Sequence, residues 1–220
     1  MDSASPAESV HQQFAYGLRF ETELVYRVRR PNGGYRFRRL LREHSPLVPH
    51  QRDESGARTC VALAAAIAKE TKVMPVPGDG QPSTEGPEQV LAMLAGRLPG
   101  HEVQSHGPEC LQDWEHIAGS ALRSNGICLL QLIQGHRARW SLVLGLEWCE
   151  VNGAVTDQSA ALLLMDVHSS PVWGVGHNAR FDPAGPPHPY QVGATRLWQL
   201  RTLDGGLIPV RPGALVTVRS

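Results

Sequence analysis

The stretch "ICLLQLIQGHRARWSLVLGLEWCEV" (residues 127–151) decides the fold class of this chain. Residues 127–134 form a continuous apolar run bounded by glycines, which is typical of a strand buried on both faces. Residues 139–151 form a second strand of this kind, and "SAALLLMDV" (159–167) forms a third. "VNGAV" (151–155) joins the last two as a hairpin. The region therefore predicts a buried sheet of antiparallel strands.

Further strands are expected toward the C-terminus, where glycines and prolines separate apolar segments. The sequence predicts a fourth strand in "GVGHNARF" (174–181) and a fifth in "YQVGATRLWQLRTL" (190–203). It predicts a closing pair or an edge in "GLIPVRPGALVTVRS" (206–220). We interpret residues 170–220 as a C-terminal strand extension.

Three helices are expected before the sheet. The first runs from Thr59, its predicted N-cap, to about Lys72. Because residues 60–68 are apolar all round, this helix should be central and buried. The second runs from 87 to 98, and the third covers about 111–124. Helices followed by a run of strands are typical of an α+β fold.

The N-terminal part adds a hairpin to this layout. Residues 22–42 predict a hairpin, in which the side chains alternate between the two faces of each strand. The turn is "PNGG" (31–34), a strong turn signal because Asn and Gly tolerate positive φ. Residues 1–13 are small and polar, and we expect a mobile tail there. The length then suits one domain over residues 14–220.

Composition excludes several classes of function. The 21 basic and 21 acidic residues balance, and no basic stripe predicts nucleic-acid binding. No apolar run reaches the length of a membrane span, and the N-terminus has no signal-peptide pattern. The four cysteines are widely spaced without a CxxC pair, which favours free thiols and a cytoplasmic location, although a signal-less export route is compatible. The histidines form no metal-binding motif, so we expect no metal and no cofactor.

Three residues follow the order of a thiol-based catalytic site. Cys60 stands at the head of the first predicted helix, where a helix dipole can activate a thiol. His136 precedes the second strand and Asp166 ends the third, so they supply a base and a carboxylate that orients it. His168 is the alternative base, because it lies two residues from Asp166 on one face of a strand. A backbone N–H or Arg139 is an equally suitable partner for Asp166.

"ARTCVALAAAIA", "RWSLVLG" and "LLLMDVH" resemble, in this order, the motifs of papain-like cysteine peptidases. The resemblance is to the branch of bacteriocin-processing peptidases that remove double-glycine leaders, and it covers roughly residues 50–170. It implies a papain-like α+β fold, with an N-terminal hairpin and a central buried helix packed on a mainly antiparallel sheet. It also implies a catalytic Cys60, His136 and Asp166.

Departures from the family pattern leave two functions open. Arg139 stands where the family has its histidine, and Glu54 where it has the glutamine of the oxyanion hole. The first function is a cysteine peptidase or related acyl-transfer enzyme. In it, Cys60 attacks a peptide or isopeptide carbonyl, His136 acts as base and then acid, and Asp166 orients it. The second is a catalytically degenerate papain-like domain that binds a protein partner.

Overall fold

The structure is a computed structural model. It describes residues 18–26, 35–42, 46–48, 55–69, 73–75, 83–151, 154–155, 161–169, 177–183, 196–202 and 205–220. For residues 18–26, 35–42, 46–48, 73–75, 149–151 and 154–155 only the backbone path is described. The expected tail at residues 1–13 and the position of Glu54 lie outside the described residues.

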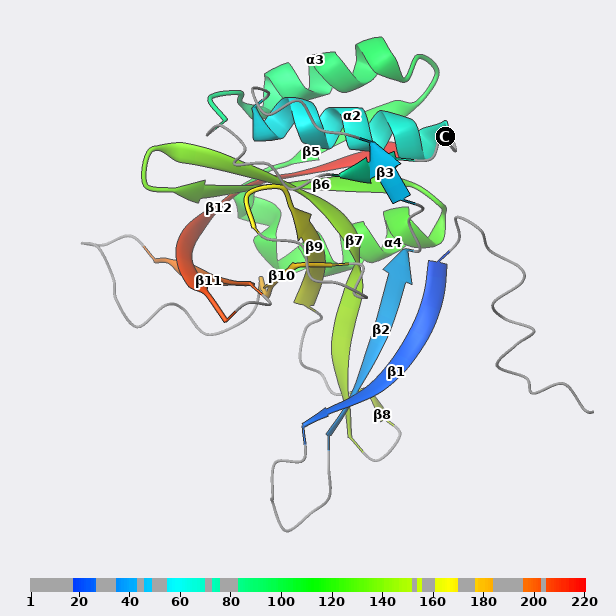
Figure 1. Ribbon diagram of the computed structural model, residues 1–220, viewed down its shortest axis with the longest axis vertical. Helices are drawn as coiled ribbons and strands as arrows, with labels where there is room; N and C mark the ends of the chain where they lie inside the picture. Colours follow the sequence, from blue (N-terminus) through cyan, green and yellow to red (C-terminus); the bar gives the residue numbers. More distant parts are fainter. Residues whose placement is uncertain are drawn as a thin grey trace, which may run out of the picture.

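Strands dominate the described part of the chain (Figure 1). The strands are β1 (Leu18–Tyr26), β2 (Tyr35–Arg42), β3 (Pro46–Val48), β4 (Val73–Pro75), β5 (Glu102–His106), β6 (Ile127–Gln134), β7 (Arg137–Val151), β8 (Ala154–Val155), β9 (Ala161–Asp166), β10 (Ala179–Phe181), β11 (Trp198–Thr202) and β12 (Leu207–Arg219). The α-helices are α2 (Gly56–Ala68), α3 (Pro87–Arg97) and α4 (Trp114–Arg123), and a 3₁₀ helix, η1, covers Pro108–Asp113. None of these helices has the length and apolar character needed to cross a bilayer.

Six of the strands close into an antiparallel barrel. Their order is β7–β6–β12–β11–β10–β9, and β9 pairs back with β7. The closing ladder places Ser141 opposite Asp166 and Val143 opposite Leu164. Its register shifts between Val143 and Gly145, and a bulge of this kind bends a strand and increases its twist. The bend lets β7 pair with β6 on one side and with β9 on the other.

The expected α+β papain-like fold with a central helix is therefore wrong, because a closed six-stranded barrel occupies the centre. Helix α2 lies outside the barrel, beside α3 (Figure 1). The residues interpreted as a C-terminal extension supply β10, β11 and β12, half of the barrel strands. Apolar runs indicate that a strand is buried on both faces, but they do not distinguish a sheet between two layers from a closed barrel.

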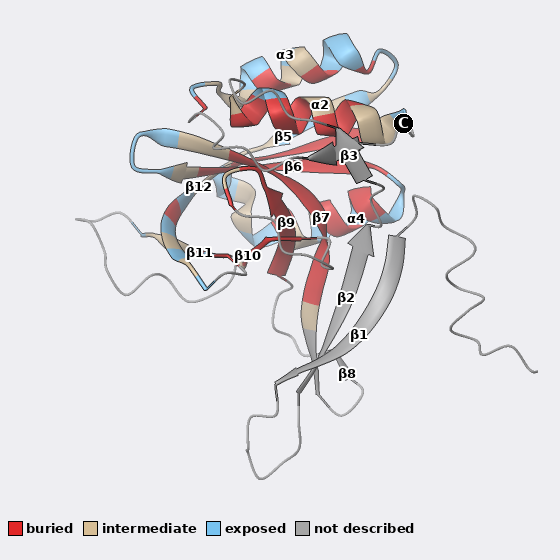
Figure 2. Ribbon diagram, viewed as in Figure 1, coloured by how far each residue is buried: buried red, intermediate tan, exposed pale blue. Residues whose placement is uncertain are grey.

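Opposite faces of the same strands belong to different apolar cores. Figure 2 shows the buried residues that run along β6 and β9. Leu129 and Leu142 face each other and pack in the core that contains α2 and α3. Leu130 and Val143, their neighbours along the strands, belong to the second core with Phe181 and with α4. Burying both strand faces in this way is the main source of stability that this fold provides.

Helix α2 begins one turn earlier than the sequence predicts. Its N-cap is Ser55, whose side chain accepts a hydrogen bond from the backbone N–H of Arg58 at 3.4 Å. Gly56 is therefore inside the helix, where an added Cβ would lie 2.5 Å from Nε2 of His168. A side chain at this position would have to displace the ring of His168. The helix ends at Ala68, before the predicted end near Lys72.

Strands β1 and β2 extend the sheet from β7 away from the barrel (Figure 1). β2 pairs with the C-terminal half of β7, from Leu41 opposite Gly145 to Arg36 opposite Glu150. β1 pairs antiparallel with β2. Within the described strands β1 has no neighbour on its other side, so it forms one edge of the sheet.

Candidate functional site

Cys60 is a fully buried thiol in the second turn of α2. Its exposed fraction is 0%, and it packs in the core that contains Trp140 and Met165. Because the helix begins at Gly56, Cys60 is not at the helix head that the sequence predicts, and the dipole effect fades within the first turn. Burial raises the pKa of the Cys60 thiol well above its ordinary value, and the negative charge of Asp166 raises it further. The sulfur is therefore protonated at neutral pH and weakly nucleophilic.

His136 lies away from this thiol, on the surface. It occupies the exposed turn between β6 and β7, next to Gly135, whose φ of 61° favours glycine. No hydrogen bond or ion pair joins His136 to Cys60 or to Asp166, all three of which are described residues. The structure therefore does not bring the predicted base to the predicted nucleophile.

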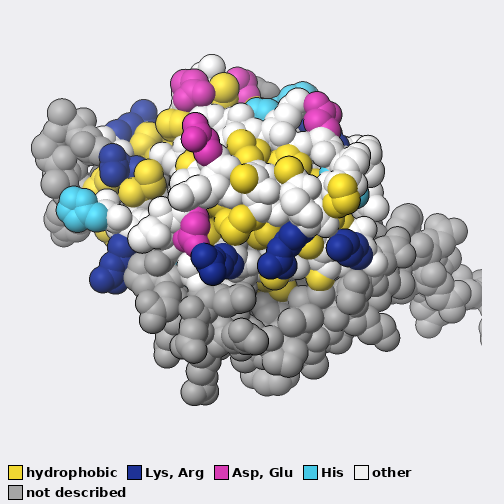
Figure 3. Space-filling model, turned by 90° about the horizontal axis from the view of Figure 1, so that it is seen from above, with side chains coloured by type: hydrophobic (Ala, Val, Ile, Leu, Met, Phe, Trp, Pro, Cys, Tyr) yellow, Lys and Arg dark blue, Asp and Glu magenta, His cyan; other side chains and the backbone are white. Residues whose placement is uncertain are grey.

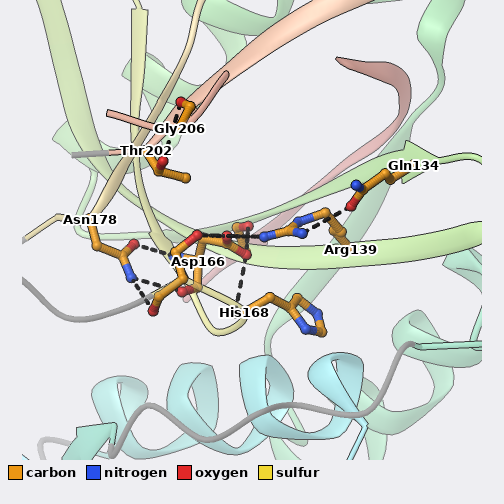
Figure 4. Close-up of polar contacts among 9 residues, drawn as sticks. Gln134, Arg139, Asp166, His168, Asn178, Thr202 and Gly206 are labelled. Atoms are coloured by element: carbon orange, nitrogen blue, oxygen red, sulfur yellow. Dashed lines mark hydrogen bonds and ion pairs between the residues drawn. The ribbon is translucent and has the colours of Figure 1, made fainter. Parts of the chain in front are cut away.

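Asp166 pairs with an arginine instead of a histidine (Figure 4). It ends β9 with its side chain completely buried, and Nη2 of Arg139 donates to its Oδ2 at 2.5 Å. The Arg139 side chain is 13% exposed, and its Nη1 also donates to Gln134 at 3.0 Å. Arg139 and Ser141 are two residues apart in β7, so their side chains lie on the same face, the one that meets Asp166 across the closing ladder. The position where the family carries a histidine thus holds a buried ion pair.

The remaining lone pairs of the Asp166 carboxylate are also occupied. The Ser141 hydroxyl donates to Oδ1 at 3.4 Å, and the backbone N–H of His168 donates to the same oxygen at 3.3 Å. The Ser169 hydroxyl donates to Oδ2. A carboxylate that is saturated in this way has little capacity left to accept a hydrogen bond from an imidazole.

Asn178 fixes the turn that carries these donors, and the sequence analysis did not identify it. Its Oδ1 accepts the backbone N–H of Asp166 at 2.7 Å, and its Nδ2 donates to the carbonyls of Asp166 and Ser169 at 2.8 and 3.0 Å. The Asn178 side chain thus supplies hydrogen-bond partners for backbone groups at the end of β9, where no described strand supplies them. Its sequence signal, an Asn after Gly-rich "GVGH", does not reveal a partner twelve residues earlier.

His168 lies against the start of α2. Its ring points toward α2 in Figure 4, and the position of a Cβ on Gly56 lies 2.5 Å from Nε2 and 2.9 Å from Cε1. Gly56 and Cys60 are four residues apart, so they share one face of the helix. The alternative base of the sequence analysis is therefore placed one helical turn from the thiol.

Taken together, these residues do not form the Cys60–His136–Asp166 arrangement that the sequence predicts. The thiol is buried and protonated, the carboxylate is neutralised by Arg139, and the predicted base lies on the surface. Among the described residues no three His, Cys, Asp or Glu side chains group as a metal ion requires. No protein-family model, curated protein or solved structure matches this chain.

Proposed function

We propose that this chain is a non-catalytic domain that binds a protein partner in the cytoplasm. The observation that carries the proposal is the Arg139–Asp166 ion pair, with a distance of 2.5 Å between Nη2 and Oδ2. In a peptidase this carboxylate would hold the imidazole of the base, whereas here it holds a cation that cannot accept a proton. Full burial of Cys60 points in the same direction, because a substrate carbonyl cannot reach the sulfur.

The extension of the sheet supports protein binding as the alternative activity. Along edge strand β1 (Leu18–Tyr26), the backbone N–H and C=O groups of alternate residues face away from β2, on a side where the described residues place no strand. An extended segment of another protein can add to such an edge as a further strand. Charge steering is a weaker candidate mechanism, because the described surface above α2 and α3 mixes acidic, basic and apolar side chains (Figure 3).

Binding is tested with the wild-type chain and Cys60→Ala as paired baits. A partner captured by both is purified and titrated by calorimetry, and amide hydrogen exchange is measured with and without it. We expect equal affinities for the two baits, and slower exchange within residues 18–26 when the partner is bound. A partner that binds only the wild-type chain would contradict a non-catalytic role for Cys60.

A cysteine peptidase or related acyl-transfer enzyme is the second candidate function. The position of His168 against the start of α2, one helical turn from Cys60, favours it. In this mechanism the Cys60 thiolate attacks a peptide or isopeptide carbonyl, and His168 in place of His136 receives the thiol proton. The site would first have to open, because Cys60 is inaccessible in the closed structure.

Alkylation by iodoacetamide at pH 6 separates the two functions. An activated Cys60 would react faster than the partly exposed Cys110, and His168→Gln would abolish the difference. The binding function predicts the reverse order, with Cys60 slower than Cys110 in both proteins. The modified peptides are quantified by mass spectrometry.

A further inference from the structure

The carboxylate of Glu85 ties the segment 83–86 to the start of α2. Oε1 accepts a hydrogen bond from the Ser55 hydroxyl at 2.7 Å, and Oε2 accepts one from the Ser83 hydroxyl at 2.7 Å. Nε of Arg58 lies 3.3 Å from Oε1. Ser55 is the N-cap of α2, so Glu85 holds the residue that in turn holds the first turn of the helix.

The backbone of the same segment is fastened to the barrel wall. The carbonyl of Glu85 accepts hydrogen bonds from Nε1 of Trp140 at 3.0 Å and from Nε2 of Gln131 at 3.4 Å. The carbonyl of Ser83 accepts the backbone N–H of Ala138 at 3.2 Å, which forms an isolated bridge to β7. Residues 83–86 thus connect the start of α2 to barrel strands β6 and β7.

The contacts of residues 83–86 are polar and confined to the start of α2 and the neighbouring barrel wall, whereas the rest of α2 is held by apolar packing. Trp140 is fully buried and belongs, with Cys60, to the core between α2 and the barrel. The segment 83–86 therefore holds the edge of the core that contains the thiol. A segment held by a few charge-assisted hydrogen bonds can open without unfolding the barrel.

We propose that residues 83–86 form a latch that the contacts of Glu85 hold closed. When this latch opens, the first turns of α2 are released and solvent reaches Cys60. The closed latch keeps the thiol inert, and the open latch presents it. The proposal rests on the contacts of residues 83–86 and not on the reactivity of Cys60, so it applies whether Cys60 is a structural or a reactive residue.

The cysteines of the chain provide the measurement. Cys60 is a residue of α2 and lies in the core between that helix and the barrel, whereas Cys128 is equally buried, at 0%, in the second core with α4. Opening of the latch exposes Cys60 alone, but global unfolding exposes both. The alkylation rate of each thiol by iodoacetamide at pH 8, determined by peptide mass spectrometry, therefore distinguishes local from global opening.

Two substitutions weaken the latch from different sides. Glu85→Gln removes the charge that pairs with Arg58 and one of two strong acceptors. Trp140→Phe keeps a ring in the core and removes the donor to the Glu85 carbonyl. Glu88→Gln, an equal loss of charge at an exposed residue of α3, is the control.

We expect Glu85→Gln to raise the alkylation rate of Cys60 by about tenfold or more, the effect of losing one charge-assisted hydrogen bond. Trp140→Phe should raise it by a smaller factor, and Glu88→Gln should leave it unchanged. The rate at Cys128 should stay constant in all three. Equal increases at Cys60 and Cys128, or no increase at Cys60 in Glu85→Gln and Trp140→Phe, would overturn the proposal.

Discussion

The buried ion pair between Arg139 and Asp166 gives the sharpest test of the structure. Removal of Arg139, as in Arg139→Met, leaves the completely buried Asp166 carboxylate with neutral donors only. Breaking a buried pair from one side typically costs about 3–5 kcal/mol of unfolding free energy. For a chain of this length, about 2–4 °C of thermal midpoint correspond to each kcal/mol, so the expected loss is about 6–20 °C.

The reverse substitution and the double variant complete the experiment. Asp166→Leu should cost a similar free energy, because it leaves the guanidinium of Arg139 buried, with only 13% of its side chain exposed. The double variant Arg139→Met/Asp166→Leu should recover most of that loss, since neither charge is then left unpaired. Urea unfolding followed by circular dichroism gives the free energies of all four proteins.

Arg180→Met serves as the matched comparison. Its pair with Glu147 has a similar distance, 2.8 Å, but the Arg180 side chain is 26% exposed, so water screens this pair more strongly and less interaction is lost with it. We expect a smaller cost than for Arg139→Met. Single variants at Arg139 and Asp166 that each cost less than about 1 kcal/mol, or whose effects simply add in the double variant, would refute the reasoning.

Three further predictions concern the start of α2. Gly56→Ala, whose methyl group would lie 2.5 Å from a histidine ring nitrogen, should cost about 1–3 kcal/mol in urea unfolding, whereas Gly96→Ala, with open space around it, should stabilise by about 0.5–1 kcal/mol. Partial burial raises the pKa of Glu85, but hydrogen bonds from neighbouring hydroxyls outweigh burial and lower it from 4.5. The charged Glu85 carboxylate therefore contributes its full stabilisation of the fold above pH 4.5, and this contribution is lost as the pH falls through the lowered pKa. The difference in unfolding free energy between wild type and Glu85→Gln should therefore shrink below pH 4.5. A constant difference would contradict this account. Asp166→Asn should lower the pKa of Cys60, seen as a shift in its alkylation–pH profile relative to Cys128, whereas a catalytic triad would predict slower alkylation.

Much of the secondary structure follows from local sequence. The apolar run at 127–134 is β6 with the same boundaries, and "PEQVLAMLAGR" after a glycine is α3. Hydrophobic periodicity and turn residues predict these elements because both are set by residues within a few positions along the chain. The start of α2 was placed too late, since Gly56 disfavours a helix locally, and its close contact with the ring of His168 comes from a distant part of the chain.

The candidate site was predicted only in part. Asp166 was expected to have a partner, with Arg139, a backbone N–H or a histidine as the candidates. The structure shows both Arg139 and a backbone N–H, that of His168, as partners. The placement of His136 could not be predicted, because a histidine next to a strand has the same sequence pattern in an exposed turn as in a site. Asn178 and Glu85 carried no signal, since each acts through contacts with residues distant along the chain.

The sequence by itself determined the apolar strands, the helices and the absence of a charge bias. The tertiary structure alone decided that six strands close into a barrel, that Cys60 is buried, and that Asp166 pairs with Arg139. The physical reason is that strand pairing and ion pairing depend on register between distant segments. The bulge between Val143 and Gly145, which bends β7 toward β9, sets that register and has no local sequence pattern.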